Sequence, residues 1–278
     1  EQARLKATIV LVKHFTHLLP SSPNPEKALK HFRQFFEQIL EKEDWVDEVG
    51  TLLKSEVLQA LARLLGVSDF LWEDFLRIQH DSLFPVVTDV DGLATRKPVE
   101  QLRAELQRLL SSCDTFDDQV EQLNAFKDRE MFRVDMRHIV GRIPEFGIFS
   151  IELTEVAELV TAGALKLCLD KLEERYGRPL TSGGDVIPIC VMGLGKAGGR
   201  ELGFASDIEL MFLYDGTGQT SGSRRISESE FFVKLVESFS HTIKAKRKGI
   251  FELDLRLRPY GNAGPLAVSL SAFTDYFS

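Results

Sequence analysis

Two acidic side chains, Asp207 and Glu209, stand at the start of an apolar run that ends near Tyr214. In a β-strand alternate residues share a face, so both carboxylates are predicted to project to one side while Ile208 points into the core. Neighbouring like charges cost free energy unless water or a cation screens them, and such oxygen ligands suit a divalent ion. The pattern suggests a metal site; an acidic strand end in solvent is the alternative.

A glycine-rich turn precedes these acids. The segment GLGKAG, residues 193–198, fits the G-x-G-x-x-G pattern of dinucleotide-binding folds, and Asp215 ends the next strand, as that pattern requires. Too few residues lie between Gly198 and Ile208, however, for the crossover helix of a parallel βαβ unit. A P-loop is excluded because Lys196 is followed by alanine. Two interpretations of the segment therefore stay open: a turn that approaches phosphate, and a tight turn with a purely structural role.

A third acid lies in the segment FELDLRLRP, residues 251–259. Read as a strand, it has three leucines on one face and three charged side chains on the other, namely Asp254, Arg256 and Arg258. Arginine matches phosphate oxygens with two parallel hydrogen bonds, and a carboxylate in the same row can hold a metal. The alternative is an exposed face of an antiparallel sheet, in which the arginines pair with Asp254 or Glu252.

The elements that must position these residues change character along the chain. Before Gly177 apolar residues recur at spacings of three and four, which predicts helices at 5–19, 28–40, 52–65, 70–78, 99–110, 116–140 and 151–176, with Ser68 and Thr154 as N-caps. Beyond it the period predicts strands at 186–192, 208–214, 250–257 and 266–270 and a helix at 227–246. We expect an α+β protein with a helical domain over 1–180 and a catalytic core over 181–278.

Composition narrows the function classes. The net charge is −8 and 44% of the residues are hydrophobic, which is typical of a globular protein. An acidic chain without a basic face predicts no nucleic-acid partner. No apolar run reaches the roughly 20 residues of a membrane span and the first residues lack a secretory cleavage site, so we expect a cytoplasmic protein without membrane contact. The three cysteines are expected to be reduced and mostly buried.

Two other charged segments favour ordinary structural roles. The groups DRE at 128–130 and DMRH at 135–138 are predicted to form a solvated helix face with pairs at i,i+3 and i,i+4. The basic run KAKRK at 244–248 is predicted to be a cationic helix end.

The motifs together resemble a known family. GLGKAGGRELGFASDIEL, followed some forty residues later by ELDLRLRPYGNAGPL, is similar to the nucleotidyltransferase core of the glutamate-ammonia-ligase (glutamine synthetase) adenylyltransferase/deadenylylase family. The resemblance includes the intervening GSRRISESEFFVKLVES and, upstream, FKDREMFRVDMRHI. It covers about Leu123 to the C-terminus; before that only helicity agrees.

The resemblance implies a DNA-polymerase-β-like nucleotidyltransferase fold, in which a small mixed sheet is flanked by helices and more helices follow the core. It implies that three acids, Asp207, Glu209 and Asp254, hold two Mg²⁺ ions. The family motif usually has Asp where this chain has Glu209. Glutamate is one methylene longer but still a hard oxygen ligand, so metal binding is expected to survive, with an effect on rate or geometry left open.

The resemblance also implies an activity: transfer of AMP from ATP to a tyrosine of glutamine synthetase, or its removal by phosphorolysis to give ADP. The nucleotide or phosphate would meet Gly195, Lys196, Gly198, Gly199, Ser206, Arg256 and Arg258. A PII-type regulatory protein is the further implied partner. The family has two such cores in tandem, and this chain looks more like the N-terminal, deadenylylating one. A non-catalytic module that binds nucleotide or glutamine synthetase is the alternative.

Overall fold

The computed structural model describes residues 2–41, 45–67, 72, 80–245 and 250–278. The chain forms two compact units: unit 1 is Glu1–Lys97 with Asp128–Phe149, and unit 2 is Pro98–Lys127 with Ser150–Ser278. The class is α+β, as expected, because helices precede a small mixed sheet. The division differs from the expected boundary at residue 180, since helices before that residue pack into the same unit as the sheet.

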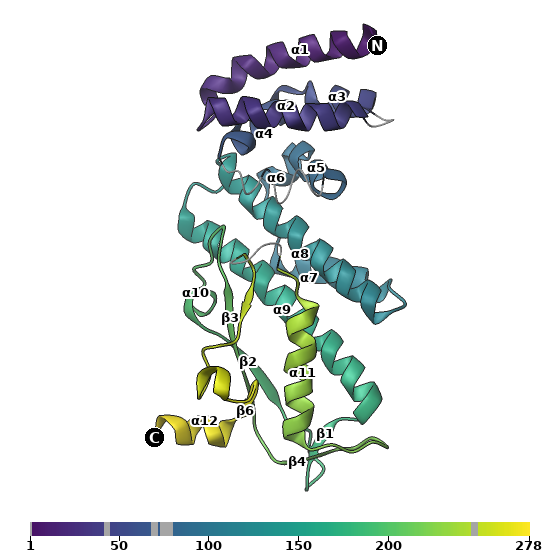
Figure 1. The fold of residues 1–278 in the computed structure, drawn as a ribbon, viewed down its shortest axis with the longest axis vertical. Coiled ribbons are helices and arrows are strands. Elements are labelled where there is room, and N and C mark those ends of the chain that lie inside the picture. The colour runs from purple at the N-terminus through teal and green to yellow at the C-terminus, as the bar shows by residue number, and fades with distance from the viewer. Residues whose placement is uncertain (1, 42–44, 68–71, 73–79, 246–249) are drawn as a thin grey trace. The chain divides into compact units, whose positions relative to one another are not determined.

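Unit 1 is helical (Figure 1). Its core is rich in aromatic side chains: the rings of Phe15 and Phe32 stack with centroids 3.7 Å apart, and Phe35 and Trp72 meet edge to face. The predicted helix at 70–78, apart from Trp72, and the predicted N-cap Ser68 lie outside the described residues. The helices are α1 (Gln2–Leu18), α2 (Pro25–Glu41), α3 (Trp45–Leu52), α4 (Ser55–Val67), α5 (His80–Thr88) and α6 (Val90–Ala94), with the 3₁₀ turn η1 (Leu19–Ser21).

Two long helices, α8 (Phe116–Ile139) and α9 (Phe146–Tyr176), contribute residues to both units, and α7 (Val99–Ser111) belongs to unit 2. The prediction that Thr154 caps a helix is wrong. Helix α9 begins at Phe146, and the Thr154 hydroxyl donates to the carbonyl of Ser150 at 2.7 Å within it. A threonine hydroxyl can bond the preceding turn as readily as it caps, so the residue type alone did not decide its position.

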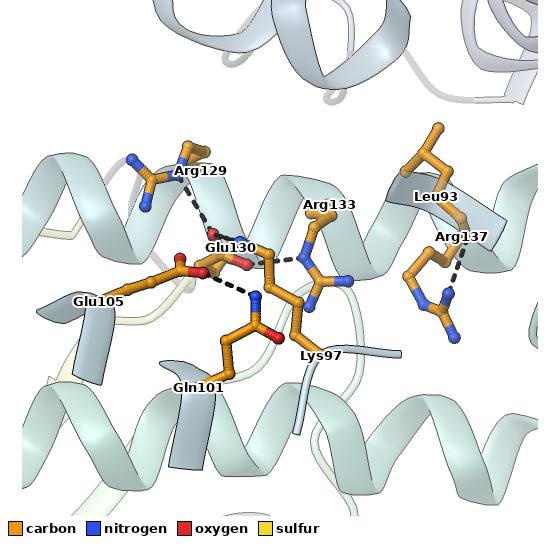
Figure 2. A network of polar contacts seen from close by, with 8 residues as sticks. All are labelled: Leu93, Lys97, Gln101, Glu105, Arg129, Glu130, Arg133 and Arg137. Carbon is orange, nitrogen blue, oxygen red and sulfur yellow. Dashed lines mark hydrogen bonds and ion pairs between the residues drawn. The ribbon is translucent and has the colours of Figure 1, made fainter. Parts of the chain in front are cut away.

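Most charged residues in the second half of α8, from Asp128 to Arg137, are buried in the structure, and the prediction of a solvated face there is wrong. Glu130 is 1% exposed; its carboxylate accepts from Lys97 at 3.0 Å, Arg129 at 3.2 Å and Arg133 at 2.6 Å (Figure 2). Arg137 donates to the carbonyl of Leu93 at 2.7 Å. These charges lie inside because partners elsewhere in unit 1 satisfy them, as buried ions require.

Unit 2 contains a mixed sheet centred on β3 (Ile208–Tyr214). Strand β2 (Ile189–Gly193) pairs antiparallel with β3 along the whole length of β2. Strand β5 (Leu253–Asp254) pairs parallel with its first two residues, and β6 (Ala267–Ser269) pairs parallel with its last three. A separate antiparallel ladder joins β1 (Pro179–Thr181) to β4 (Gly218–Thr220).

The two faces of β3 pack against different helices. Phe212 and Tyr214 pack on Phe239 and Phe232 of α11 (Glu228–Thr242), which runs beside the strands in Figure 1. Met211 and Leu213 point the other way, into a small cluster with Val268 that Phe273 of α12 (Leu270–Phe277) completes. Residue alternation therefore places Glu209 on the face that α12 partly covers.

Helices α8 and α9 are tied to the end of α11 by buried polar contacts. The Asn124 amide donates to the carbonyl of Thr242 and accepts from the backbone N–H of Lys244, both at 2.8 Å. Lys127 donates to the carbonyl of Lys244, and the thiol of Cys168 lies 3.3 Å from the Thr242 hydroxyl. These bonds fix the backbone just beyond α11, on the way to the strand that carries Asp254.

The remaining expectations concern membranes and thiols. No helix among the described residues is long and apolar enough to cross a membrane. All three cysteines are free, but burial holds only for Cys168, because Cys113 is half-buried and Cys190 exposed.

Candidate active site

The three predicted acids share one face of the sheet. Glu209 lies directly opposite Asp254 in the parallel register of β3 and β5. Asp207 immediately precedes β3 and is two residues from Glu209, so it continues the same row. Two backbone hydrogen bonds continue the pairing beyond Asp207: Ile208 N–H donates to the carbonyl of Glu252 at 2.8 Å, and Phe251 N–H donates to the carbonyl of Ser206 at 2.9 Å.

Asp207 has an unsatisfied carboxylate oxygen. Its Oδ1 atom is buried and has no hydrogen-bond partner among the residues that the structure describes. An acceptor left in this state costs roughly 1–3 kcal/mol, so such an atom needs an explanation. Coordination of a cation would supply one, because an ionised carboxylate is an acceptor-only group and a hard oxygen ligand.

Asp254 is held by an arginine. Both of its oxygens accept from the Arg256 guanidinium, with Nη2 2.6 Å from Oδ2 and Nε 2.9 Å from Oδ1, and Oδ1 also accepts from the Arg256 backbone N–H. The side-chain hydrogen bond lowers the pKa of Asp254 below its ordinary value. The same pair raises the pKa of Arg256, to which the nearby charges of Asp207 and Glu252 also contribute.

The predicted strand at 250–257 is shorter than expected, and the predicted alternation is wrong beyond Asp254. Because the Asp254 side chain bonds the backbone two residues on, it forms a turn in place of the next ladder bond. Leu257 is consequently exposed, not buried. Arg256 therefore reaches back over Asp254 from a loop.

The acids fit a metal only in part. Among the residues that the structure describes, no group of three or more His, Cys, Asp or Glu side chains is close enough to hold a metal ion. Asp207 and Glu209 offer oxygens on one face, and Asp207 Oδ1, which has no hydrogen-bond partner among the described residues, is chemically suited to a cation. Asp254 can join them only when Arg256 releases it.

The glycine turn lies directly against Glu209. Strand β2 ends at Gly193, and a single helical turn, α10 (Gly195–Gly198), follows. Gly195 has φ +50°, and a Cβ on it would lie 1.7 Å from Glu209 Oε2. A Cβ on Gly198 would lie 2.4 Å from the carbonyl oxygen of Gly193. Glycine is required at both positions so that the turn can pass this close to the acid row.

The other predicted phosphate ligands have mixed positions. Gly199 and Lys196 are exposed on the turn. The buried Ser206 hydroxyl accepts from Gly203 N–H at 3.0 Å. The Arg258 guanidinium donates to carbonyl oxygens of its own loop, among them Pro265 at 3.0 Å. The structure therefore brings Arg256 and the turn to the acids, while Arg258 stabilises the loop that follows.

Comparison with known proteins bears on this arrangement. Residues 58–278 match the family model described as glutamate-ammonia ligase adenylyltransferase. The chain belongs to this family. The matched part contains the acid row, the glycine turn and the buried network of α8.

Curated members of the glutamate-ammonia ligase adenylyltransferase family align with most of the chain. This chain is 30% identical over 258 residues to the bifunctional glutamine synthetase adenylyltransferase/adenylyl-removing enzyme of Shewanella loihica. The alignment covers 91% of this chain and 26% of that protein. The same-named protein of Pseudomonas aeruginosa is 32% identical over 270 residues, covering 92% of this chain and 26% of that protein. The chain thus spans about a quarter of the length of these relatives.

The sequence did not predict a role for one residue near the site, Arg200. Arg200 ends the glycine turn and reaches α9, where its Nη2 atom lies 3.5 Å from Glu155 and 3.6 Å from Glu158. The two glutamates are spaced i,i+3 on a predicted helix. That spacing was the available signal for a cation shared by both carboxylates, and it was not used. Nothing in the sequence named the partner.

Proposed function

We propose that this chain is the nucleotidyltransferase core of an enzyme that adds AMP to, or removes it from, a tyrosine of glutamine synthetase. The observation that carries the proposal is the register that sets Glu209 opposite Asp254, beside the unpartnered oxygen of Asp207 and against the glycine turn. Family membership and the names of the curated relatives support the same conclusion. The polymerase-β-like architecture is part of this proposal.

Asp207, Glu209 and Asp254 would hold Mg²⁺, which would supply positive charge to the reacting phosphate when bound. The glycine turn lets phosphate oxygens approach the backbone N–H groups of Gly198 and Gly199. Arg256 is 71% exposed and attached by a flexible side chain, so it can leave Asp254 and pair with a phosphate oxygen. Lys196 adds a second exposed cation at the turn. These groups orient the phosphate and balance its charge.

Two reactions share this arrangement. In adenylylation the tyrosine oxygen loses its proton and bonds to the α-phosphorus of ATP, and pyrophosphate leaves. In phosphorolysis an oxygen of inorganic phosphate bonds to the phosphorus of the tyrosine-linked AMP, the tyrosine–phosphorus bond breaks, and ADP and the protonated tyrosine result. We propose removal as the reaction of this chain, because its motifs look more like the N-terminal core. Cytoplasmic location and regulation by a PII-type protein belong to the same proposal.

The test offers the chain both substrates. Adenylylated glutamine synthetase is incubated with phosphate and Mg²⁺, and unmodified glutamine synthetase with ATP and Mg²⁺; intact-mass measurement then follows the loss or gain of one AMP. Loss of AMP with release of ADP is expected for the wild type and not for Asp207→Asn. No mass change in either direction, or full activity of Asp207→Asn, contradicts the proposal.

A second candidate, a non-catalytic module that binds nucleotide, is favoured by one observation. Arg256 already neutralises Asp254, so the third acid is not free to bind metal in this structure. Such a module would be stabilised by ATP without transferring AMP. A thermal-shift comparison of ATP plus Mg²⁺ with NAD separates both candidates from a dinucleotide-binding protein, which NAD alone would stabilise.

A further inference from the structure

Arg200 occupies a backbone conformation that disfavours it. Its φ is +56°, in the left-handed region, where a long side chain is uncommon and glycine or asparagine fits at lower cost. The three preceding positions all carry small residues, Ala197, Gly198 and Gly199, so the large side chain at position 200 stands out within the turn. A strained residue of this kind points to a role for its side chain.

The side chain of Arg200 has two partners on α9. Its guanidinium lies 3.5 Å from Glu155 Oε1 and 3.6 Å from Glu158 Oε2, one helical turn apart. Glu155 is only 10% exposed, so this ion pair is less screened by water than a surface pair. Two carboxylates therefore hold one cation that is attached to the end of the glycine turn.

The glycine turn does not pack closely on α9. A hollow of about 400 Å³ lies between them, lined on one side by Gly193, Ala197 and Gly198 and on the other by Ala157 and Thr161. Across this hollow the turn makes no van der Waals contact that would resist its movement toward the helix.

In the described part of the chain, the backbone hydrogen bonds that join the turn to the sheet lie at one end of the turn. The first end is fixed to β3, because Leu194 N–H donates to the Glu209 carbonyl at 2.9 Å. Bonds such as Gly198 N–H to Leu194 and Gly199 N–H to Gly195 set the shape of the turn, but both join residues within it. The Arg200 ion pairs cross from the second end to α9.

We propose that Arg200 is a positioning residue that holds the second end of the glycine turn at a fixed distance from α9 and thereby sets the affinity for the polyphosphate of the nucleotide. The identity of the ligand rests on the proposed function. The fixing of the turn to α9 by Arg200, called the clamp below, rests on the ion pairs, the left-handed backbone and the hollow. A displaced turn weakens contacts to ground state and transition state alike, so KM changes while kcat does not.

The test compares three variants of the chain. Arg200→Asn keeps a residue that tolerates the left-handed backbone but removes the charge, and Arg200→Lys keeps the charge. Arg178→Asn is the matched control, because Arg178 also pairs with a glutamate of α9, Glu173 at 3.0 Å, but lies next to β1. ATP binding with Mg²⁺ is measured by calorimetry, and KM and kcat by AMP transfer or removal.

We expect the dissociation constant for ATP and the KM to rise about tenfold in Arg200→Asn, which corresponds to about 1.4 kcal/mol. Arg200→Lys should recover a large part of this loss, and Arg178→Asn should equal the wild type. In a double-mutant cycle, Glu155→Gln combined with Arg200→Asn should be no worse than the poorer single variant. Equal ATP affinity in wild type and Arg200→Asn, or a fall in kcat at unchanged KM, overturns the proposal.

A second measurement keeps the clamp testable if the proposed function fails. Absence of ATP binding by the wild type would contradict AMP addition by this chain, but neither AMP removal nor the clamp. Hydrogen exchange at the amides of Gly198 and Gly199 would then decide, because release of the turn must speed their exchange in Arg200→Asn. Unchanged exchange there would overturn the clamp independently.

Discussion

Two carboxylates of this chain have opposite surroundings. In unit 1, Glu130 is 1% exposed and accepts from three cations, Lys97, Arg129 and Arg133. In unit 2, Asp207 has a buried oxygen without a partner. The first carboxylate is satisfied by its own protein and the second is not.

Under the proposed function, this difference separates a structural charge, Glu130, from a functional one, Asp207. Burial alone would raise the pKa of Glu130, but the charges and hydrogen bonds of Arg133 and Lys97 outweigh it and leave the pKa below its ordinary value. The protein therefore favours the ionised form of Glu130. At Asp207 an acceptor stays available, which costs stability and, under the proposed function, is the oxygen that a cation completes.

Neutralising Glu130 is expected to have the largest effect on stability. Glu130→Gln removes the negative charge from a guanidinium, that of Arg133, which is only 7% exposed. Breaking a buried pair by removing one charge costs about 3–5 kcal/mol, and denaturant unfolding measures this loss. The control is Asp170→Asn, which breaks the exposed pair with Lys166 and should cost less than about 0.5 kcal/mol. Equal losses in the two variants would contradict the structural role of Glu130.

The unpartnered Asp207 predicts a stabilising ligand. Mg²⁺ at 100 times its dissociation constant should raise the free energy of unfolding of the wild type by about 2.7 kcal/mol. Asp207→Asn should abolish this increase, yet unfold without Mg²⁺ at nearly the wild-type denaturant concentration, because Asp207 Oδ1 accepts no hydrogen bond from the described residues and water screens the charge of the exposed Arg256 nearby. A Mg²⁺ response that persists in Asp207→Asn would show that the ion binds elsewhere.

Much of the site could be predicted from the sequence. The strand at 208–214 agrees with the prediction at both ends, because an uninterrupted apolar run between polar residues defines it. The long helices also agree closely, since periodicity over several turns is a strong signal. Alternation then placed Asp207 and Glu209 on one face, and the register with Asp254 completes the row.

The rest depends on contacts between distant parts of the chain. The charges of α8 look solvated in the sequence, because Lys97 lies more than thirty residues before Glu130. The strand at 250–257 shortens to β5 because side-chain bonds of Asp254 and Arg258 compete with the ladder. The left-handed backbone of Arg200 has no signal of its own, since its residue type argues against it.

Asp135 extends the comparison to a buried carboxyl that its surroundings do not satisfy. It is 1% exposed, its Oδ1 atom has no hydrogen-bond partner in the described part of the chain, and burial raises its pKa well above the ordinary value. A raised pKa means that the folded state holds the proton more tightly, so stability falls as pH rises from about 4 toward the folded pKa.

Asp135→Asn should remove this pH dependence. The variant should match the wild type near pH 4 and become more stable above it, by about 1.4 kcal/mol for each unit by which the pKa is raised. Chemical unfolding at several pH values measures the difference. A wild type whose stability does not decline over this range relative to Asp135→Asn would show that the carboxyl is satisfied after all.

Arg256→Gln is expected to have the smallest effect on stability, because the guanidinium is largely exposed and water screens the pair. The lowered pKa of Asp254 means that the pair stabilises the fold above the unfolded pKa of about 3.9 and that this contribution disappears as pH falls through the folded pKa. The variant should therefore lose a little stability at neutral pH and none in acid, and carboxyl NMR should show the pKa of Asp254 moving up toward its ordinary value. An unchanged pKa would mean that Arg256 does not hold Asp254 in solution, and Asp254 would then resemble the open Asp207 more than the satisfied Glu130.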